Sequence, residues 1–131
     1  MTLHLSAAPV STVPPFVRTL RAADRAMLDV ARRHRLRPME AYLLLLLVEL
    51  DEPAPTQVLA ARVAASPSQA KQLALALQAR GFAERQAHTG LTAITDAGRD
   101  AAAVLAVELH EALRTRVAPL EPAEAWRALD L

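Results

Sequence analysis

The sequence predicts a mostly α-helical fold in which a helix-turn-helix is followed by a short β-hairpin, the arrangement called a winged helix-turn-helix. Apolar residues make up 53% of the chain but aromatic residues only 3%. Alanine and leucine, which favour helices, account for much of the apolar part. A helix-start signal lies mid-chain at Ser66-Pro67-Ser68-Gln69. Gly81 and Gly90 then stand where a helix end and a hairpin turn need them.

Length and composition narrow the class of protein. A chain of 131 residues fits one domain. It contains no cysteine, which excludes disulfides and thiolate metal sites. The apolar run from Met39 to Leu50 is too short to span a bilayer and predicts a buried helix. The first fifteen residues lack the pattern of a secretory signal, so we expect a cytoplasmic protein with no membrane partner.

The charge of the chain is unevenly distributed, although its net value is only +1. Residues 16–37 contain seven arginines against two aspartates, whereas residues 51–100 contain five basic and five acidic residues. A basic N-terminal third is suited to phosphate groups. A net charge this close to zero does not by itself indicate a nucleic-acid partner.

The first two helices are predicted from apolar spacing. Residues 1–15 have no helical period and are expected to form a flexible arm. Apolar residues at every third or fourth position predict a helix over residues 16–34. Arg37-Pro38 follows, and a residue before proline avoids helical geometry. A second helix is predicted from Pro38 to about Leu50.

The helix-turn-helix is predicted from helix-start signals. Thr56 is a natural N-cap for a short helix over residues 57–64. Ser66 supplies the next N-cap, and Gln69 three residues later completes a capping box for a helix that runs to residue 80. The two helices are thus joined by about three residues, Ala64-Ala65-Ser66.

A hairpin and two further helices complete the predicted order. Residues 82–87 and 91–95 are expected to pair as strands around a turn at His88-Thr89-Gly90. Thr95 is expected to cap a long helix over residues 96–117, and a last short helix follows it.

This arrangement predicts a DNA-binding site. The second helix of such a unit enters the major groove, while the wing contacts the neighbouring minor groove or backbone. Glutamine can bond adenine bidentately, and lysine reaches guanine or phosphate. The candidate DNA contacts are Ser66, Ser68, Gln69, Lys71, Gln72, Arg85, His88 and Arg37. Taken alone, the helix fits a purely structural role equally well, with its polar residues facing water.

Four segments carry a resemblance to a known family: LRPMEAYLLLLLVEL, TQVLAARVAASPSQAKQLALALQARGFAER, LTAITDAGRD and LEPAEAWRAL. In this order and spacing they resemble the MarR family (multiple-antibiotic-resistance regulators) over residues 16–131. The resemblance implies a winged-helix core, about residues 38–96, between dimerisation helices, about residues 16–36 and 97–131. It also implies a homodimer on double-stranded DNA at a pseudo-palindromic operator, controlled by a small aromatic or anionic ligand.

Two features depart from the pattern of that family. The turn between Arg85 and Leu91 is about five residues short and has no arginine at its tip. The second helix of the helix-turn-helix has Gln72 near the usual place of an arginine, and the single cation on its outward face is Lys71. These departures favour an alternative function, in which a MarR-like fold has lost operator binding and acts as a protein-interaction module or antirepressor.

The expected dimer interface combines an apolar stripe of the long helix with the last helix: Leu105, Leu109, Leu113, Trp126 and Leu129. No pattern predicts catalysis, a metal site or a cofactor. His110-Glu111 are adjacent and diverge on a helix, so they make a poor pair of metal ligands. No serine lies in a nucleophile elbow, and there is no glycine-rich phosphate loop. We therefore expect a DNA-binding regulator and not an enzyme.

Overall fold

The structure, a computed structural model, describes residues 14–117. It is mostly helical with one small sheet, so the predicted fold class is confirmed. The arm expected over residues 1–15 falls almost wholly outside the described residues. The short helix predicted after residue 117, with Trp126 and Leu129, lies outside the described residues too.

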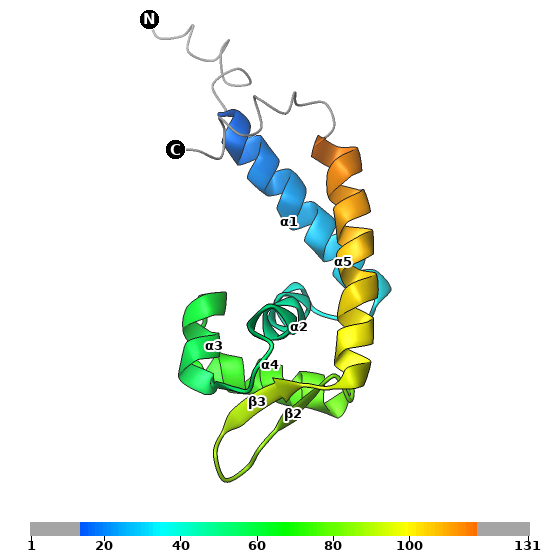
Figure 1. Cartoon of the computed structure of the whole chain (residues 1–131). Coiled ribbons are helices and arrows are strands. Elements are labelled where there is room, and N and C mark those ends of the chain that lie inside the picture. Colours follow the sequence, from blue (N-terminus) through cyan, green and yellow to red (C-terminus); the bar gives the residue numbers. More distant parts are fainter. Residues whose placement is uncertain (1–13, 118–131) are drawn as a thin grey trace, which may run out of the picture.

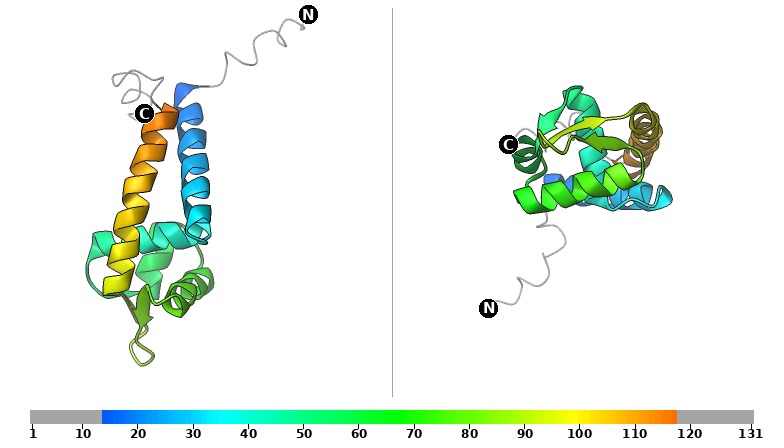
Figure 2. Two further views of the ribbon diagram at one scale, coloured as in Figure 1. Left: turned by 90° about the vertical axis from the view of Figure 1, so that its right-hand side faces the viewer. Right: turned by 90° about the horizontal axis from the view of Figure 1, so that it is seen from below.

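Two long helices extend from a winged-helix body (Figures 1 and 2). Helix α1 spans Pro15–Arg33 and helix α5 spans Asp96–Val117, and the two lie side by side. The body holds three shorter helices and the sheet. The shorter helices are α2 (Pro38–Leu50), α3 (Thr56–Val63) and α4 (Pro67–Ala79). The predicted helices up to residue 117 are all present, and their ends agree to within one residue.

The centre of the body is α2. Its leucines Leu43, Leu44, Leu46 and Leu47 are buried and belong to the hydrophobic core, and the helix contacts α1, α3, α4 and α5. A helix with neighbours on several sides needs apolar residues on several faces, which explains the unbroken apolar run. None of the helices within residues 14–117 is long and apolar enough to cross a membrane.

The predicted hairpin is confirmed, but it belongs to a three-stranded sheet. Strands β2 (Ala83–Arg85) and β3 (Leu91–Ile94) pair antiparallel, and a third strand, β1 (Ala54–Pro55), pairs with the other edge of β3. Strand β1 was not predicted, because two residues are too few to show the alternation of a strand. Proline has no N–H to donate, so an edge position suits it.

The start of α4 follows the predicted capping box. The Gln69 N–H donates to Ser66 Oγ at 3.1 Å, and the Ser66 N–H donates to Gln69 Oε1 at 3.0 Å. The predicted cap of α3 is wrong. Thr56 is the first helical residue and Pro55 occupies the N-cap without a side-chain hydrogen bond. Because Pro55 is still paired with β3, the chain passes directly from strand into helix.

Thr95 caps α5 as predicted and ties it to the end of α4. The Gly98 N–H donates to Thr95 Oγ1 at 3.0 Å, and this hydroxyl donates to the carbonyl oxygen of Gly81 at 2.6 Å. Gly98 lies so close to the start of the hairpin that a Cβ atom there would stand 2.0 Å from the carbonyl oxygen of Phe82. Only glycine therefore fits this contact.

Three helices end in a left-handed residue that is not glycine. The φ angle is 58° at Arg35, 53° at Asp51 and 57° at Ala64. After α1, the Leu36 N–H donates to the carbonyl oxygen of Ala31 at 2.9 Å, the long hydrogen bond of a Schellman motif. A left-handed L-residue costs roughly 1–2 kcal/mol, and glycine avoids this cost.

The apolar stripe of α5 requires a correction to the predicted dimer interface. Leu105 is buried in the core of its own chain, so it does not face a second copy. Leu109 and Leu113 are half-buried. Sequence periodicity identifies an apolar stripe but not the partner that covers it. Among the α5 side chains that the structure describes, up to residue 116, the large apolar ones that are exposed are instead Val104 and Val107.

Candidate DNA-binding surface

Helix α4 exposes a polar face and buries an apolar one. Ala70, Ala74 and Leu77 are buried, because α4 packs on α2, α3 and β2. The exposed face, called the polar face below, consists of Ser68, Gln69, Lys71, Gln72 and Leu75. Four of the predicted DNA contacts are thus brought onto one surface. Leu75, 41% exposed, is an apolar member not included among the predicted contacts.

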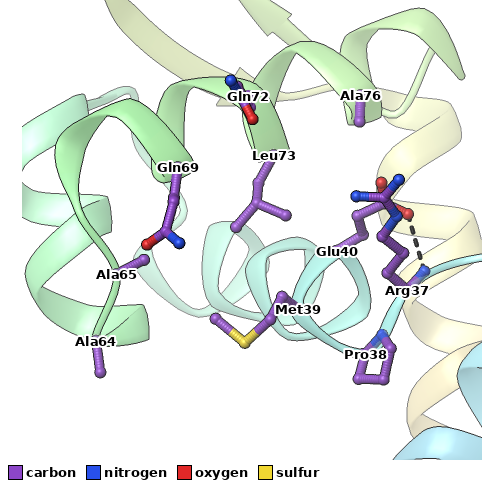
Figure 3. Close-up of a pocket in the computed structure, with 10 residues that line it drawn as sticks. All are labelled: Arg37, Pro38, Met39, Glu40, Ala64, Ala65, Gln69, Gln72, Leu73 and Ala76. Carbon is purple, nitrogen blue, oxygen red and sulfur yellow. Dashed lines mark hydrogen bonds between the residues drawn. The ribbon is translucent and has the colours of Figure 1, made fainter.

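The polar face lies between two flanks of α4. At about 100° per residue, Gln69 and Gln78 are nine residues apart and point to opposite sides of the helix. Gln78 points towards the hairpin, since its Oε1 accepts the Arg85 N–H at 2.7 Å. Gln69 lies on the other side, where its amide points towards Ala65 and lines a groove together with the start of α2 (Figure 3). The hairpin therefore borders one side of the polar face, and the turn between α1 and α2 borders the other.

The hairpin turn is held by its own hydrogen bonds. The Gly90 N–H donates to the Gln86 carbonyl at 2.7 Å, and the Thr89 hydroxyl donates to Gln86 Oε1 at 2.8 Å. Gly90 takes a φ of 71°, as its place in the turn predicts. His88, the predicted contact at the tip, is exposed. The turn is therefore short and ordered by its own hydrogen bonds, and its tip exposes the imidazole of His88.

Arg85 lies apart from the other predicted contacts. Its side chain is half-buried and runs along the hairpin, with Nη2 3.5 Å from the place of a Cβ atom at Gly90. Its Nε is buried and has no hydrogen-bond partner within the described residues, and the same is true of the hydroxyl of Thr92. Arg85 and Thr92 are opposite each other in the sheet register. Arg85 thus contributes to the hairpin itself more than to the surface of the molecule.

A groove of about 810 Å³ separates α4 from the start of α2 (Figure 3). Gln69, Gln72 and Leu73 line one wall, and Arg37 and Met39 line the other. The carboxylate of Glu40 accepts the Arg37 N–H at 2.9 Å, which fixes the first turn of α2. Arg37, a predicted contact, therefore lies across the groove from two residues of the polar face.

A second groove, of about 520 Å³, shares lining residues with the first and extends towards the end of α4. Its lining includes four arginines and one acidic residue: Arg32, Arg35, Arg37, Arg80 and Glu40. We call the four arginines the basic corner. Of these four, the sequence predicted a phosphate contact by Arg37 or Arg35, from the cluster of arginines before Pro38.

Arg80 fastens the basic corner to the end of α4. Its Nη1 donates to the carbonyl oxygen of Arg35 at 2.9 Å and its Nη2 to that of His34 at 3.1 Å. Its guanidinium also lies over the ring of Phe82, 5.2 Å from the centroid. Arg80, at the end of α4, therefore holds the turn after α1 across the second groove.

The acidic residues near the end of α1 pair with other cations. Glu108 of α5 accepts from Arg33 at 3.2 Å and lies 3.0 Å from His34 Nε2. Arg116 pairs with Asp29, which joins the two long helices a second time. Within residues 14–117, no three histidine, cysteine or acidic side chains gather in a way that could hold a metal ion.

Solved structures match this chain, whereas no protein-family model and no curated protein does. A MarR-family transcriptional regulator from a Rhodococcus species is 21% identical, with a TM-score of 0.76 over 87% of this chain and 85% of that one. A MarR-family protein from Mycobacterium tuberculosis, solved in complex with DNA, is 15% identical, with a TM-score of 0.71 over 85% of this chain and 86% of that one. CouR from Rhodococcus jostii, bound to p-coumaroyl-CoA, is 23% identical, with a TM-score of 0.69 over 86% of this chain and 78% of that one.

These observations define the class of protein. It is a winged helix-turn-helix protein with two long helices beside the body. Within that class, the fold is that of the MarR-family transcriptional regulators.

Proposed function

We propose that this chain is a DNA-binding transcriptional regulator that acts as a homodimer, with α4 of each subunit in the major groove of a pseudo-palindromic operator. The observation that carries the proposal is the polar face of α4, which is exposed, held by a capping box and bordered by arginines. The fold adds support, since one similar structure is a complex with DNA.

The polar face contains the side chains that read base edges. Gln72 is suited to adenine, Lys71 to guanine or phosphate, and Ser68 near the helix start to phosphate. Leu75 is suited to the methyl group of thymine. The carbonyl oxygen of the Gln69 amide is used in the capping box, so its amino group is the part free to donate to DNA.

The sharpest test is the sequence preference of two variants. Duplexes selected from a random pool give the preferred site. Gln72→Ala should then cost about 1–3 kcal/mol on that site only. Lys71→Ala should weaken binding to every duplex and reduce the slope of log affinity against log salt by about two per dimer. Arg18→Ala, at the far end of α1, is the control and should change neither quantity.

The homodimer has a separate test. Val104 is 50% and Val107 69% exposed on α5, and Leu20 is 50% exposed on α1. We propose that a second copy covers apolar residues of these helices. Sedimentation should give a dimer, and Val107→Glu should weaken it because a charge is costly in an apolar interface. A monomeric full-length chain at micromolar concentration contradicts the proposal.

We also propose that a small ligand controls DNA binding. The support is that CouR is bound to p-coumaroyl-CoA. Such a ligand must bind one spacing of the two α4 helices better than another, because equal affinity for both shifts no population. A panel of small aromatic acids should contain members that raise the melting temperature and weaken DNA binding. A flat response across the panel contradicts ligand control of this kind.

A second candidate function is the protein-interaction module. The hairpin favours it, because Glu84 is exposed while Arg85 is half-buried, so this flank has little net attraction for phosphate. If the full-length dimer shifts no duplex at about 50 mM salt, even with an arginine placed at residue 88, this function replaces DNA binding.

A further inference from the structure

We propose that the basic corner is the principal phosphate-binding surface of this protein, and that the DNA backbone runs along the grooves between α4 and the turn that joins α1 to α2. The inference rests on the proposed DNA binding and adds to it. It assigns the phosphate contacts to the flank of α4 that lies opposite the hairpin.

The first argument is charge. The second groove is lined by four arginines and a single acidic residue, Glu40. Arg32, Arg35 and Arg37 are exposed. Among residues 14–117, the ion pairs to carboxylates involve other arginines: Arg33, Arg99, Arg114 and Arg116. Three exposed guanidinium groups therefore stand beside the polar face, ready to neutralise phosphates.

The second argument is position. Gln69 and Gln72 belong both to the polar face and to the wall of the first groove, and Ala76 lines both grooves. A duplex whose base edges meet Gln72 therefore places a phosphodiester strand close to Arg37. Backbone contacts on the edge of a recognition helix fix its register in the major groove.

The third argument is the fixed shape of the corner. Arg35 occupies a left-handed position, with φ 58°, where glycine would be free of strain. The two hydrogen bonds from Arg80 hold the carbonyl groups on either side of that strained link. The backbone below the arginines is thus ordered before DNA binds, which reduces the entropy lost on binding.

The hairpin flank has no comparable set of cations. Its charged residues are Glu84, which is exposed, and Arg85, whose Nε is buried in the hairpin. His88 at the tip is the only further basic side chain in the hairpin, residues 82–95. Electrostatic attraction to DNA must therefore come chiefly from the other flank.

The experiment compares two triple variants with the same loss of charge. The test variant is Arg32→Gln/Arg35→Gln/Arg37→Gln, and the matched control is Arg18→Gln/Arg21→Gln/Arg25→Gln, at earlier positions of α1. Binding to a random duplex and to the selected site is measured as a function of salt. Each phosphate contact contributes about 0.9 to the salt slope, so six lost contacts per dimer should flatten it by roughly five. The control should keep the slope of the original chain.

Two further variants distinguish the loss of phosphate contacts from the loss of the fold. Thermal unfolding shows whether each variant is folded. Replacing the same three arginines by lysine keeps the charge and should retain most of the salt slope. Arg32→Gln alone lies within α1, away from the strained turn, and should flatten the slope by about two. If the original chain binds no DNA, the proposed function itself fails. If it binds DNA and the test and control triples have equal slopes, the basic corner is not the phosphate site.

Discussion

The two flanks of α4 are built in different ways. The hairpin flank is ordered by backbone hydrogen bonds, a glycine turn and a half-buried arginine, and it offers almost no net charge to its surroundings. The corner flank holds its backbone with Arg80 and exposes three more arginines at its surface. The hairpin flank thus provides an ordered backbone beside α4, and the corner flank provides positive charge.

This separation explains how a short wing is compatible with DNA binding. The turn between Arg85 and Leu91 has no arginine at its tip. A wing of this kind can support α4 through Gln78 while contributing little to phosphate binding. The charge that a longer wing would carry is available instead on the other side of α4.

The largest expected effect on stability comes from the contact between the start of α5 and the start of the hairpin. Gly98→Ala gains about 1 kcal/mol of helix propensity. The new Cβ overlaps the Phe82 carbonyl group, which belongs to the backbone and has to move, at a cost of about 3 kcal/mol. The free energy of unfolding, measured in urea, should therefore fall by about 2 kcal/mol. Ala103→Gly, exposed on the same helix, is the control for propensity and should lose about 1 kcal/mol. Unchanged stability of Gly98→Ala contradicts the contact.

Loss of the hydrogen bonds that hold the basic corner should lower the free energy of unfolding by a smaller amount. Arg80→Met removes two hydrogen bonds to carbonyl oxygens at an exposed site, which should cost about 1 kcal/mol of unfolding free energy. The same change should weaken DNA binding, because the turn that presents Arg35 loses its support. Arg62→Met, on an exposed position of α3, provides the comparison for stability. An equal loss of stability in both variants shows that Arg80 does not fasten the corner.

Two glycine substitutions separate backbone strain from charge. Ala64→Gly and Arg35→Gly each relieve a left-handed residue and should raise the unfolding free energy by up to about 1 kcal/mol. Only Arg35→Gly removes a cation of the basic corner, so only this variant should lose DNA affinity. Similar DNA affinity for the two variants is the result that contradicts a phosphate contact by Arg35.

The smallest expected effect is a gain at the hairpin tip. His88→Arg adds a cation at the exposed position, whereas Thr89 is occupied by hydrogen bonds to Gln86 and Leu91. DNA binding should tighten, with a salt slope steeper by up to about two per dimer. The gain should be greatest on A·T-rich flanks, where the minor groove is narrow. No gain on any duplex indicates that the shortened hairpin does not reach DNA.

The features predicted from the sequence are those that depend on local chemistry. The start of α4 was predicted because a serine, a proline and a glutamine suffice to form its cap. The cap of α3 was predicted wrongly, because the pairing of Pro55 with β3 decides where that helix begins. Leu105 was assigned to a dimer interface because periodicity does not reveal which surface covers a stripe.

In the candidate site, too, the features that depend on one helix were predicted better than those that depend on tertiary contacts. Four residues of the polar face were predicted, since spacing along one helix determines its exposed side. In the basic corner, Arg35 or Arg37 was predicted to contact phosphate, whereas Arg80 was not, because it is far along the sequence from them and joins them only in the folded chain. Arg85 was predicted as a DNA contact from its place beside the turn, whereas its half-burial depends on its place opposite Thr92, which spacing along the chain does not reveal.

The most direct test of the central claim maps which flank lies on the DNA backbone. The chain has no cysteine, so Ala79→Cys beside the basic corner and His88→Cys at the hairpin tip each provide one attachment point for an iron–EDTA cleavage reagent. With each labelled dimer bound to the selected duplex, we expect strong backbone cleavage from residue 79, beside each half-site, and weaker cleavage from residue 88. Cleavage from residue 88 alone would contradict the account.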